Sequence, residues 1–402
     1  MTDRPRLLVL APRFPYPPLA GGTQILLNIL RALDGWDLTL LSFCASSEEM
    51  AFVPSDGLFR DIHKVPLPKW KSVRNVLFAL PSRTPLQIAY YRSAEFRTRV
   101  DELLPRHDIV LAHLIRTGQY VQGAHIRRPG VLLMSDAISM AYDSMARVGG
   151  ASALWSGLYR VERRRLFDYE QAAPGWFNQT WLHSDVDRKF LGLPSDRVRI
   201  VTLGINLDEF PFRATAAGHV VAFIGNMSFA LNLDACLHFL RTIFPQVRKE
   251  RDLRFRVIGV CPPAVKKKLL EFPGVEVTGR VERIADAVDG AFCGICPVRG
   301  GSGIQNKILN YMALGLPCVT SPTGLEGLDA TPGSDLFVYK NEAEAARLIV
   351  RLYDDADLRH AMAISAREYV ERAHDMKEIQ KTVRAEMAAV LASGASTAPR
   401  TF

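Results

Sequence analysis

In residues 299–328 a glycine-rich loop leads directly into a short apolar helix, and this segment carries the residue types best suited to chemistry. Gly300, Gly301 and Gly303 permit positive φ and the close approach of a ligand. The helix after them has free backbone amides at its first turn, and such amides favour an anion. Lys307 falls in that turn, where a cation is poorly placed unless a negative ligand balances the helix dipole. The segment predicts a diphosphate-binding loop; the alternative is a glycine-rich turn that only joins strand to helix.

The limits of this helix follow from its cap and stop residues. Ser302 is expected to cap the first turn. Apolar residues at spacing four predict a buried stripe, and they are Ile304, Ile308 and Met312. Gly315 ends the pattern shortly before Pro317. Lys307 is left on another face, at an exposed position.

Composition indicates a globular chain of two domains. The chain of 402 residues is longer than a single hydrophobic core usually supports, and 48% of its residues are apolar. No apolar run reaches the length of about 20 residues that spans a bilayer, and the start does not resemble a signal peptide. The six cysteines are scattered, which suits a reducing compartment. We expect a cytoplasmic protein, and no metal site at the isolated CxxC of Cys293 and Cys296.

The formal charge of +8 is concentrated in part of the chain. Residues 64–97 interleave Lys and Arg with Trp, Phe and Tyr, a mixture that suits an anionic membrane surface or a phosphorylated acceptor. The alternative is that these aromatic residues pack the first domain. Nucleic acid is not expected, because 42 acidic residues offset the basic ones and no nucleic-acid-binding motif is found.

Apolar strands alternate with helical patterns twice along the chain. This repetition predicts an α/β protein with two doubly wound, Rossmann-like domains that face each other across a cleft. The polar step FRATAAGH at residues 212–219 is the expected linker. We expect a first domain at 1–211, a second at 212–373, and a helix at about 374–395 that packs back on the first.

Ligands of such domains bind at the carboxyl ends of the parallel strands. Polar residues and glycines stand at several of these ends, namely Gly21, Gly22, His113, Asp136, Gly225 and Asn226. These positions are the first candidates for a site beyond the loop.

Several motifs in order resemble the retaining GT-B glycosyltransferases of family 4 over nearly the whole chain. The segments PLQIAYYRSAEF, FIGNMSFALNLDA and GSGIQNKILNYMALGLPCV are similar to the branch found in exopolysaccharide gene clusters, including the PEP-CTERM-associated group. PYPPLAGGTQ resembles the amino-terminal glycine loop of that family, which abuts the donor phosphates. The resemblance implies transfer of a sugar, with retention, from a nucleotide diphosphate sugar to a glycan or lipid-linked acceptor, without a metal cofactor.

The expected site residues fall into three groups. Those expected to act in catalysis are Lys307, Arg299 and His113, where His113 matches a family histidine near the donor sugar. Those expected to bind the donor are Gly21, Gly22, Gly225, Asn226, Gly301, Ser302, Gly303, Asn310 and Glu326. Those expected to bind the acceptor are Asp136 and Arg92. We further expect peripheral contact with the inner face of an anionic membrane.

The chain departs from the family at charged positions. Ser302 and Asn310 stand where many members have two glutamates eight positions apart, and an amide lacks the carboxylate charge. Asn226 and Asn232 replace the usual Arg and Lys after the VVAFIG strand. Phosphate binding then depends on Lys307, on Arg299 and on backbone amides.

Two other functions remain open. One is a catalytically silent protein that binds a sugar nucleotide within a polysaccharide assembly. The other is a sugar-nucleotide epimerase of the same fold, which needs an acid and a base in the cleft. Asp136 and Glu326 are poor candidates for those roles.

Overall fold

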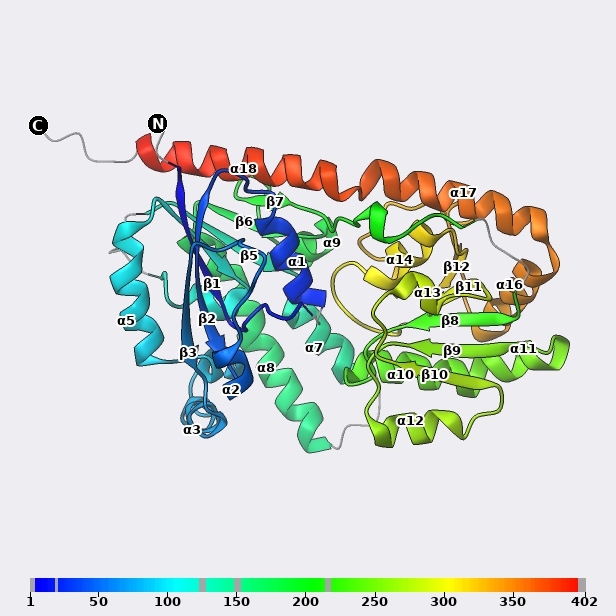
Figure 1. The fold of residues 1–402 in the computed structure, drawn as a ribbon. Coiled ribbons are helices and arrows are strands. Elements are labelled where there is room, and N and C mark those ends of the chain that lie inside the picture. The colour runs from blue at the N-terminus through cyan, green and yellow to red at the C-terminus, as the bar shows by residue number, and fades with distance from the viewer. Residues whose placement is uncertain (1–3, 19–20, 123–127, 148–152, 214–217, 397–402) are drawn as a thin grey trace, which may run out of the picture. The chain divides into compact units, whose positions relative to one another are not determined.

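The computed structural model describes residues 4–18, 21–122, 128–147, 153–213 and 218–396. The chain divides into two compact units. The first comprises Met1–Ala146, Ala151–Thr202 and Ile379–Phe402, and the second comprises Arg147–Gly150 and Leu203–Glu378. Each unit is built on its own parallel sheet, as the repeated strand and helix pattern predicts (Figure 1).

The first unit contains a seven-stranded sheet in the order β3-β2-β1-β4-β5-β6-β7. Its strands are β1 (Arg6–Ala11), β2 (Asp37–Cys44), β3 (Asp61–Pro66), β4 (Ile109–His113), β5 (Gly130–Ser135), β6 (Gln179–Leu182) and β7 (Val198–Ile200). All neighbouring strands pair in parallel. Their carboxyl ends therefore share one edge of the sheet.

Helices follow most of these strands. They are α1 (Gly21–Leu30), α2 (Ser47–Ala51), α3 (Lys69–Ala79), α4 (Leu86–Tyr90), α5 (Ala94–Leu103), α6 (Ile115–Gly118), α7 (Ile138–Arg147), α8 (Ala153–Ala172), α9 (Asp185–Phe190) and α18 (Met376–Ser396). Successive side chains of a strand point to opposite faces. Leu8 of β1 lies in the same buried cluster as Phe96 of α5, whereas Leu7 clusters with Leu26 of α1 and Met387 of α18. Figure 1 shows α5 and α1 on opposite sides of this sheet.

The second unit contains a six-stranded parallel sheet in the order β10-β9-β8-β11-β12-β13. Its strands are β8 (Val220–Ile224), β9 (Arg254–Ile258), β10 (Val275–Gly279), β11 (Ala291–Cys296), β12 (Cys318–Thr320) and β13 (Phe337–Val338). Its helices are α10 (Ala230–His238), α11 (Phe244–Glu250), α12 (Pro263–Leu270), α13 (Ile284–Ala287), α14 (Asn306–Leu314), α15 (Pro322–Leu325), α16 (Glu342–Asp354) and α17 (Ala356–Ala373). A π-helical turn, Phe239–Ile243, connects α10 to α11.

Tyr311 anchors α14 on the central strands of the second sheet. Its ring is fully buried, and its hydroxyl accepts a hydrogen bond from the amide of Ile224 at 2.8 Å. The same hydroxyl lies 3.2 Å from the carbonyl oxygen of Ala222 and 3.3 Å from that of Ile295. Gly294 lies beneath the ring, and a Cβ at this position would stand 2.5 Å from the ring carbon Cγ. The position of α14, and of the loop before it, therefore depends on a glycine in β11.

We expect Gly294→Ala to destabilise the second unit by roughly 1–3 kcal/mol, because a methyl group cannot be accommodated without moving Tyr311. Thermal unfolding should then shift down by roughly 2–10 °C. The matched control is Gly157→Ala in α8, where a Cβ meets no atom within 4 Å and alanine is the better helix former. Equal unfolding temperatures for the two variants would contradict this packing.

The change from the first unit to the second occurs before residues 212–219. The amide of Ile205 donates to the carbonyl of His374 at 2.7 Å, and the amide of Met376 donates to the carbonyl of Ile205 at 3.1 Å. These bonds attach the stretch after Thr202 to the second unit. Residues 214–217 of the expected linker lie outside the described residues. None of the helices within the described ranges combines the length and apolar character needed to cross a bilayer.

Candidate functional site

Lys307 is the second residue of α14, in the first turn as predicted. Its side chain is nearly buried, with 7% of the residue exposed. The Nζ atom donates to Asn232 Oδ1 at 2.9 Å and to Gln305 Oε1 at 3.4 Å, and it lies 5.3 Å from the centre of the Phe223 ring. Within the described part of the chain, Lys307 forms no ion pair.

The sequence-based expectation of an exposed Lys307 is wrong. The helix lies against the sheet through Tyr311, so the face that carries Lys307 is directed toward Phe223 of β8 and Asn232 of α10. A nearly buried ammonium group is normally paired with an acid. Here its partners are two neutral amide oxygens and an aromatic ring. This leaves a positive charge that an anion can neutralise.

The loop before α14 has one of its glycines in a left-handed conformation, Gly303 with φ of 66°. The prediction that Ser302 caps the helix is wrong, because Gln305 occupies the cap position and makes no side-chain cap bond. The turn at Gly303 delays the start of α14 to Asn306. The first-turn amides are consequently not covered by a capping side chain, which is the arrangement that suits a phosphate group.

We expect Gly303→Val to weaken nucleotide binding, because a β-branched residue does not adopt this φ and crowds the loop. The matched control is Gly333→Val, since Gly333 has a φ of 88° in another loop of the same unit. Calorimetry with nucleoside diphosphates should show a loss of about tenfold or more for the first variant and an unchanged affinity for the second. Equal nucleotide affinities in both variants would indicate that the loop before α14 only connects β11 to the helix and does not bind the ligand.

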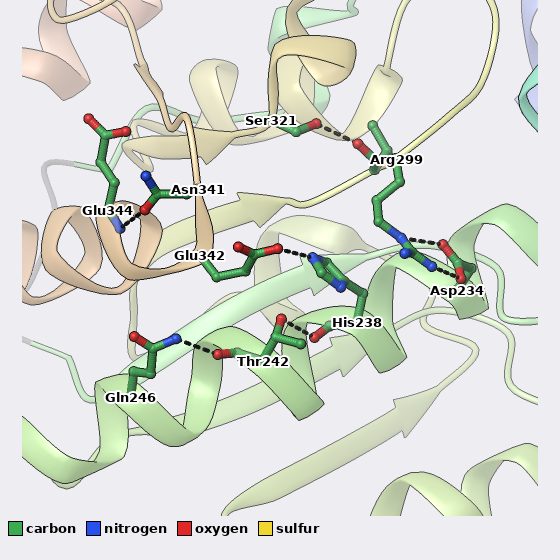
Figure 2. Close-up of polar contacts among 10 residues, drawn as sticks. Asp234, His238, Thr242, Gln246, Arg299, Ser321, Asn341, Glu342 and Glu344 are labelled. Atoms are coloured by element: carbon green, nitrogen blue, oxygen red, sulfur yellow. Dashed lines mark hydrogen bonds and ion pairs between the residues drawn. The ribbon is translucent and has the colours of Figure 1, made fainter. Parts of the chain in front are cut away.

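Arg299 is held by an acid from α10. Its Nη2 lies 2.5 Å from Asp234 Oδ1, and its Nε donates to Asp234 Oδ2 at 3.1 Å. Figure 2 shows this pair, and it shows His238 of the same helix turned toward Glu342 of α16, with 3.5 Å between Nε2 and Oε1. The charge of Arg299 is therefore balanced within the protein. Lys307, rather than Arg299, is the cation of the expected donor site with no acid beside it in the described residues.

Gly225 and Asn226 follow β8 and shape the support for Lys307. Asn226 Oδ1 accepts from the amide of Ser228 at 2.9 Å, and the main-chain carbonyl oxygen of Asn226 accepts from Asn232 Nδ2 at 3.1 Å. Asn232 thus connects the end of β8 to Lys307. A Cβ on Gly225 would stand 3.1 Å from side-chain atoms of Met227 and Phe223 and 3.3 Å from Asn232, so a larger residue would require these side chains to shift. Asn226 therefore stabilises the turn after β8, and Asn232 is the residue that contacts Lys307.

The remaining donor candidates of the second unit are Asn310 and Glu326. Asn310 is partly exposed on α14. Glu326 directly follows α15 and is partly buried, which raises the pKa of its carboxyl group. Neither side chain has a hydrogen-bond partner among the described residues. Both are available to polar groups of a ligand.

His113 ends β4 in the first unit and is almost fully buried. Burial lowers the pKa of its imidazole to about 3, with smaller contributions from Arg116 and His183. The ring is therefore neutral at physiological pH, and its Nδ1 has no hydrogen-bond partner in the described structure. A neutral histidine with a free nitrogen can bind a hydroxyl group.

Two strained residues flank the strand ends at this edge. Leu114 has φ of 62° and Ser135 has φ of 71°, conformations that are uncommon for residues other than glycine. They adjoin His113 and Asp136, the two candidates at these ends. Burial raises the pKa of Asp136 to about 6. Strain of this kind concentrates at functional sites, so it supports a site at this edge of the sheet.

The other candidates of the first unit lie at a helix start and on the surface. Gly21 and Gly22 form the first turn of α1. Arg92 is exposed between α4 and α5, and its Nη2 donates to Thr84 Oγ1 at 3.3 Å.

Two of the surface hollows are lined by residues other than these candidates. One lies around the end of α16 and includes Arg351 and Asp354. The other lies in the first unit and contains Arg13 and Arg116, which the sequence did not single out. Within the described residues, no three His, Cys, Asp or Glu side chains gather in a way that could hold a metal ion.

Comparison with known proteins finds a family match and a curated relative for parts of this chain. Residues 218–355 match the protein family described as "Glycosyl transferases group 1". A protein described as "Uncharacterized 44.6 kDa protein in cps region" of Klebsiella pneumoniae is 22% identical over 172 residues, which cover 40% of this chain and 44% of that protein. The chain thus spans less than half the length of the curated relative it matches.

Solved structures resemble the whole chain. Sucrose-phosphate synthase from Thermosynechococcus elongatus superposes with a TM-score of 0.73 at 13% identity, over 97% of this chain and 100% of that one. Anabaena HepE, solved in complex with UDP and glucose, gives a TM-score of 0.68 at 11% identity, over 95% and 99% of the two chains. HepE in complex with UDP-glucose gives 0.68 at 12% identity, again over 95% and 99%. At these identities the likeness shows the fold, and the chain has the GT-B fold that its sequence predicts.

The family match covers most of the second unit, including Lys307, Gly303 and the strands that position them. Residues 218–355 of this chain are therefore similar to the group 1 glycosyl transferases, within a chain of GT-B fold.

Proposed function

We propose that this protein transfers a sugar from a nucleoside diphosphate sugar to a glycan or lipid-linked acceptor in polysaccharide biosynthesis, with retention at the anomeric carbon. The single observation that carries the proposal is Lys307, a nearly buried ammonium group at the start of α14 that contacts neutral partners. Negative charge grows on the diphosphate as its bond to the sugar breaks, and a fixed cation stabilises that charge. The binding of UDP and UDP-glucose by HepE, which shares the fold, supports a nucleotide sugar as donor.

Retention is expected to proceed by attack on the face from which the diphosphate leaves. The acceptor hydroxyl forms a bond to the anomeric carbon while the bond to the diphosphate breaks. The electron pair stays with the diphosphate oxygen, which receives the acceptor proton. No Asp or Glu occurs between Asp289 and Glu326, so the loop offers no carboxylate to act as nucleophile. His113, as a neutral imidazole, is proposed to bind a hydroxyl of the donor sugar.

The relative encoded in a cps region supports polysaccharide synthesis as the setting, here of the exopolysaccharide type. A panel of nucleotide sugars tests the activity directly. Transfer or slow hydrolysis releases free nucleoside diphosphate, which chromatography detects. An epimerase would instead yield an isomerised sugar nucleotide, and a silent binding protein would yield neither product. Either of the last two results would overturn the proposal.

We expect activity to persist in excess EDTA. The proposed charge stabilisation comes from Lys307 and the amides at the start of α14, which chelation does not remove. The release of nucleoside diphosphate should proceed at the same rate with and without EDTA. Complete loss that Mg²⁺ restores would identify a required cation.

We also propose that the first unit contacts an anionic membrane at its cytoplasmic face through α3. Trp70, Leu77 and Phe78 of this helix are 61%, 59% and 76% exposed, which is unusual for large apolar side chains. Residues 62–94 contain no Asp or Glu, so the basic residues of α3 are unopposed along this part of the chain. The sequence-based alternative of core packing applies to Tyr91, which is buried, and not to α3.

A further inference from the structure

The first unit contains a pocket of about 500 Å³ that none of the expected site residues line. Its walls come from the residues after four neighbouring strands. Pro12 and Arg13 follow β1, Ala45 follows β2, Leu67 follows β3, and Arg116 follows β4. These strands stand side by side in the order β3-β2-β1-β4. The pocket therefore opens at the edge of the sheet where parallel α/β domains bind their ligands.

Two arginines enter this pocket, and each is fixed through Nε alone. Arg116 Nε donates to Gln87 Oε1 at 2.9 Å, and Arg13 Nε donates to the Tyr91 hydroxyl at 3.3 Å. The Arg116 guanidinium also lies over the Tyr91 ring, 5.6 Å from its centre. The terminal Nη groups of both arginines have no hydrogen-bond partner in the described part of the chain. The orientation of each guanidinium is thus set while its paired donors remain free.

No acid lies within ion-pair distance of either arginine in the described structure, although Glu49 is close enough to Arg13 to add to the increase in its pKa that the Tyr91 hydrogen bond causes. Among the described residues, neither forms an ion pair. Burial lowers the pKa of Arg116, and the positive charge of Arg13 lowers it further. The pocket includes one acid, Glu49, and its Oε2 accepts from the amide of Ala45 at 2.6 Å. Two like charges in one pocket repel each other, and an anion between them would remove that repulsion.

We infer that this pocket binds an anionic group of the acceptor, a phosphate or a carboxylate, through the Nη atoms of Arg13 and Arg116. This inference rests on the proposed sugar transfer for calling the ligand an acceptor. Arginine binds both oxyanions through two parallel N–H groups, which gives geometric selection as well as charge. Tyr91 and Phe43 add aromatic surface to the walls, which suits a ligand with an apolar or sugar portion beside its anion. Neutral sugars would then be poor acceptors.

The test measures acceptor binding separately from donor chemistry. Calorimetry uses the full chain saturated with nucleoside diphosphate, so that the donor site is filled. The probes are geranyl phosphate and methyl glucuronide, with geraniol and methyl glucoside as their neutral counterparts. We expect one anionic probe to bind, and Arg116→Gln and Arg13→Gln each to weaken it about tenfold or more. Phosphate binding would indicate a phosphorylated acceptor, and glucuronide binding an acidic sugar.

Two further variants keep the result interpretable. Arg99→Gln removes an exposed arginine of α5 in the same unit and should leave probe affinity unchanged. Arg116→Lys retains the charge but not the paired donors. It should therefore weaken binding, but less than Arg116→Gln does. The inference is overturned if neither anionic probe binds, if the neutral counterparts bind equally well, or if the arginine variants bind like wild type. Cleavage of the donor by the wild type is a separate result, so either proposal can fail without the other.

Discussion

Replacing Lys307 with alanine is expected to lower the turnover of donor by a factor of about 10² to 10³. The ammonium group has no acid beside it among the residues that the structure describes, and Asn232 and Gln305 hold it in place before any ligand arrives. A group preorganised in this way stabilises the leaving diphosphate without further reorganisation. The measurement is the steady-state release of nucleoside diphosphate, with kcat and KM determined separately. We expect most of the loss in kcat, because the charge on the diphosphate is greatest in the transition state.

The control must separate charge from packing, because Lys307 is only 7% exposed. Truncation to alanine removes the aliphatic stem as well as the ammonium group, so some loss of stability accompanies it. Lys307→Met keeps a stem of similar length without the charge. We expect this variant to retain the unfolding temperature of the wild type and to lose activity as the alanine variant does. Normal activity in a folded Lys307→Met variant would remove the lysine charge from the mechanism.

Reversing three charges on α3 is expected to weaken binding to anionic vesicles by a factor of about 100 or more. Lys69, Lys71 and Arg74 are exposed, and two of them lie near the Trp70 ring, with Lys71 Nζ at 5.6 Å and the Arg74 guanidinium carbon at 5.4 Å from its centre. Each basic residue at such a surface contributes about 1 kcal/mol. Apolar side chains beside the charges add contact with the headgroup boundary. Sedimentation with vesicles that contain anionic lipid measures the loss.

The matched control is the reversal of Lys266, Lys267 and Lys268 on α12, which changes the net charge by the same amount. This variant should sediment nearly as well as wild type if α3 is the contact surface. Raising the salt concentration should weaken wild-type binding, because the attraction is screened. Equal loss in both triple variants would indicate that net charge alone drives the binding. Failure of the wild type to sediment at low salt would make a freely diffusing acceptor the better account.

The sequence predicted the elements of the fold because its signals are local. The apolar run and terminal glycine of VVAFIG predict a buried strand, and β8 occupies Val220–Ile224. The repeated strand and helix pattern predicts parallel sheets, and both sheets are parallel. Gly303 was expected to permit a positive φ, and its φ is 66°. Ser302 failed as a cap because that turn displaces the helix start, an effect that residue type alone does not reveal.

The partners of the site residues could not be predicted, because they come from distant parts of the chain. Lys307 is buried by Phe223 and Asn232. Asn232, which accepts its hydrogen bond, lies 75 positions earlier in the sequence. The charge of Arg299 is balanced by Asp234, 65 positions earlier. The Arg13 and Arg116 pocket joins the ends of four strands whose order in the sheet differs from their order in the chain. Single-sequence patterns carry no information on such pairings.

The most direct test of the central claim is a crystal structure of the protein with the nucleoside diphosphate of its donor. The account predicts an oxygen of the diphosphate at about 2.7–3.0 Å from Lys307 Nζ, with further hydrogen bonds from the amides around Gly303. A diphosphate bound elsewhere, with Lys307 still bonded only to Asn232 and Gln305, would contradict it.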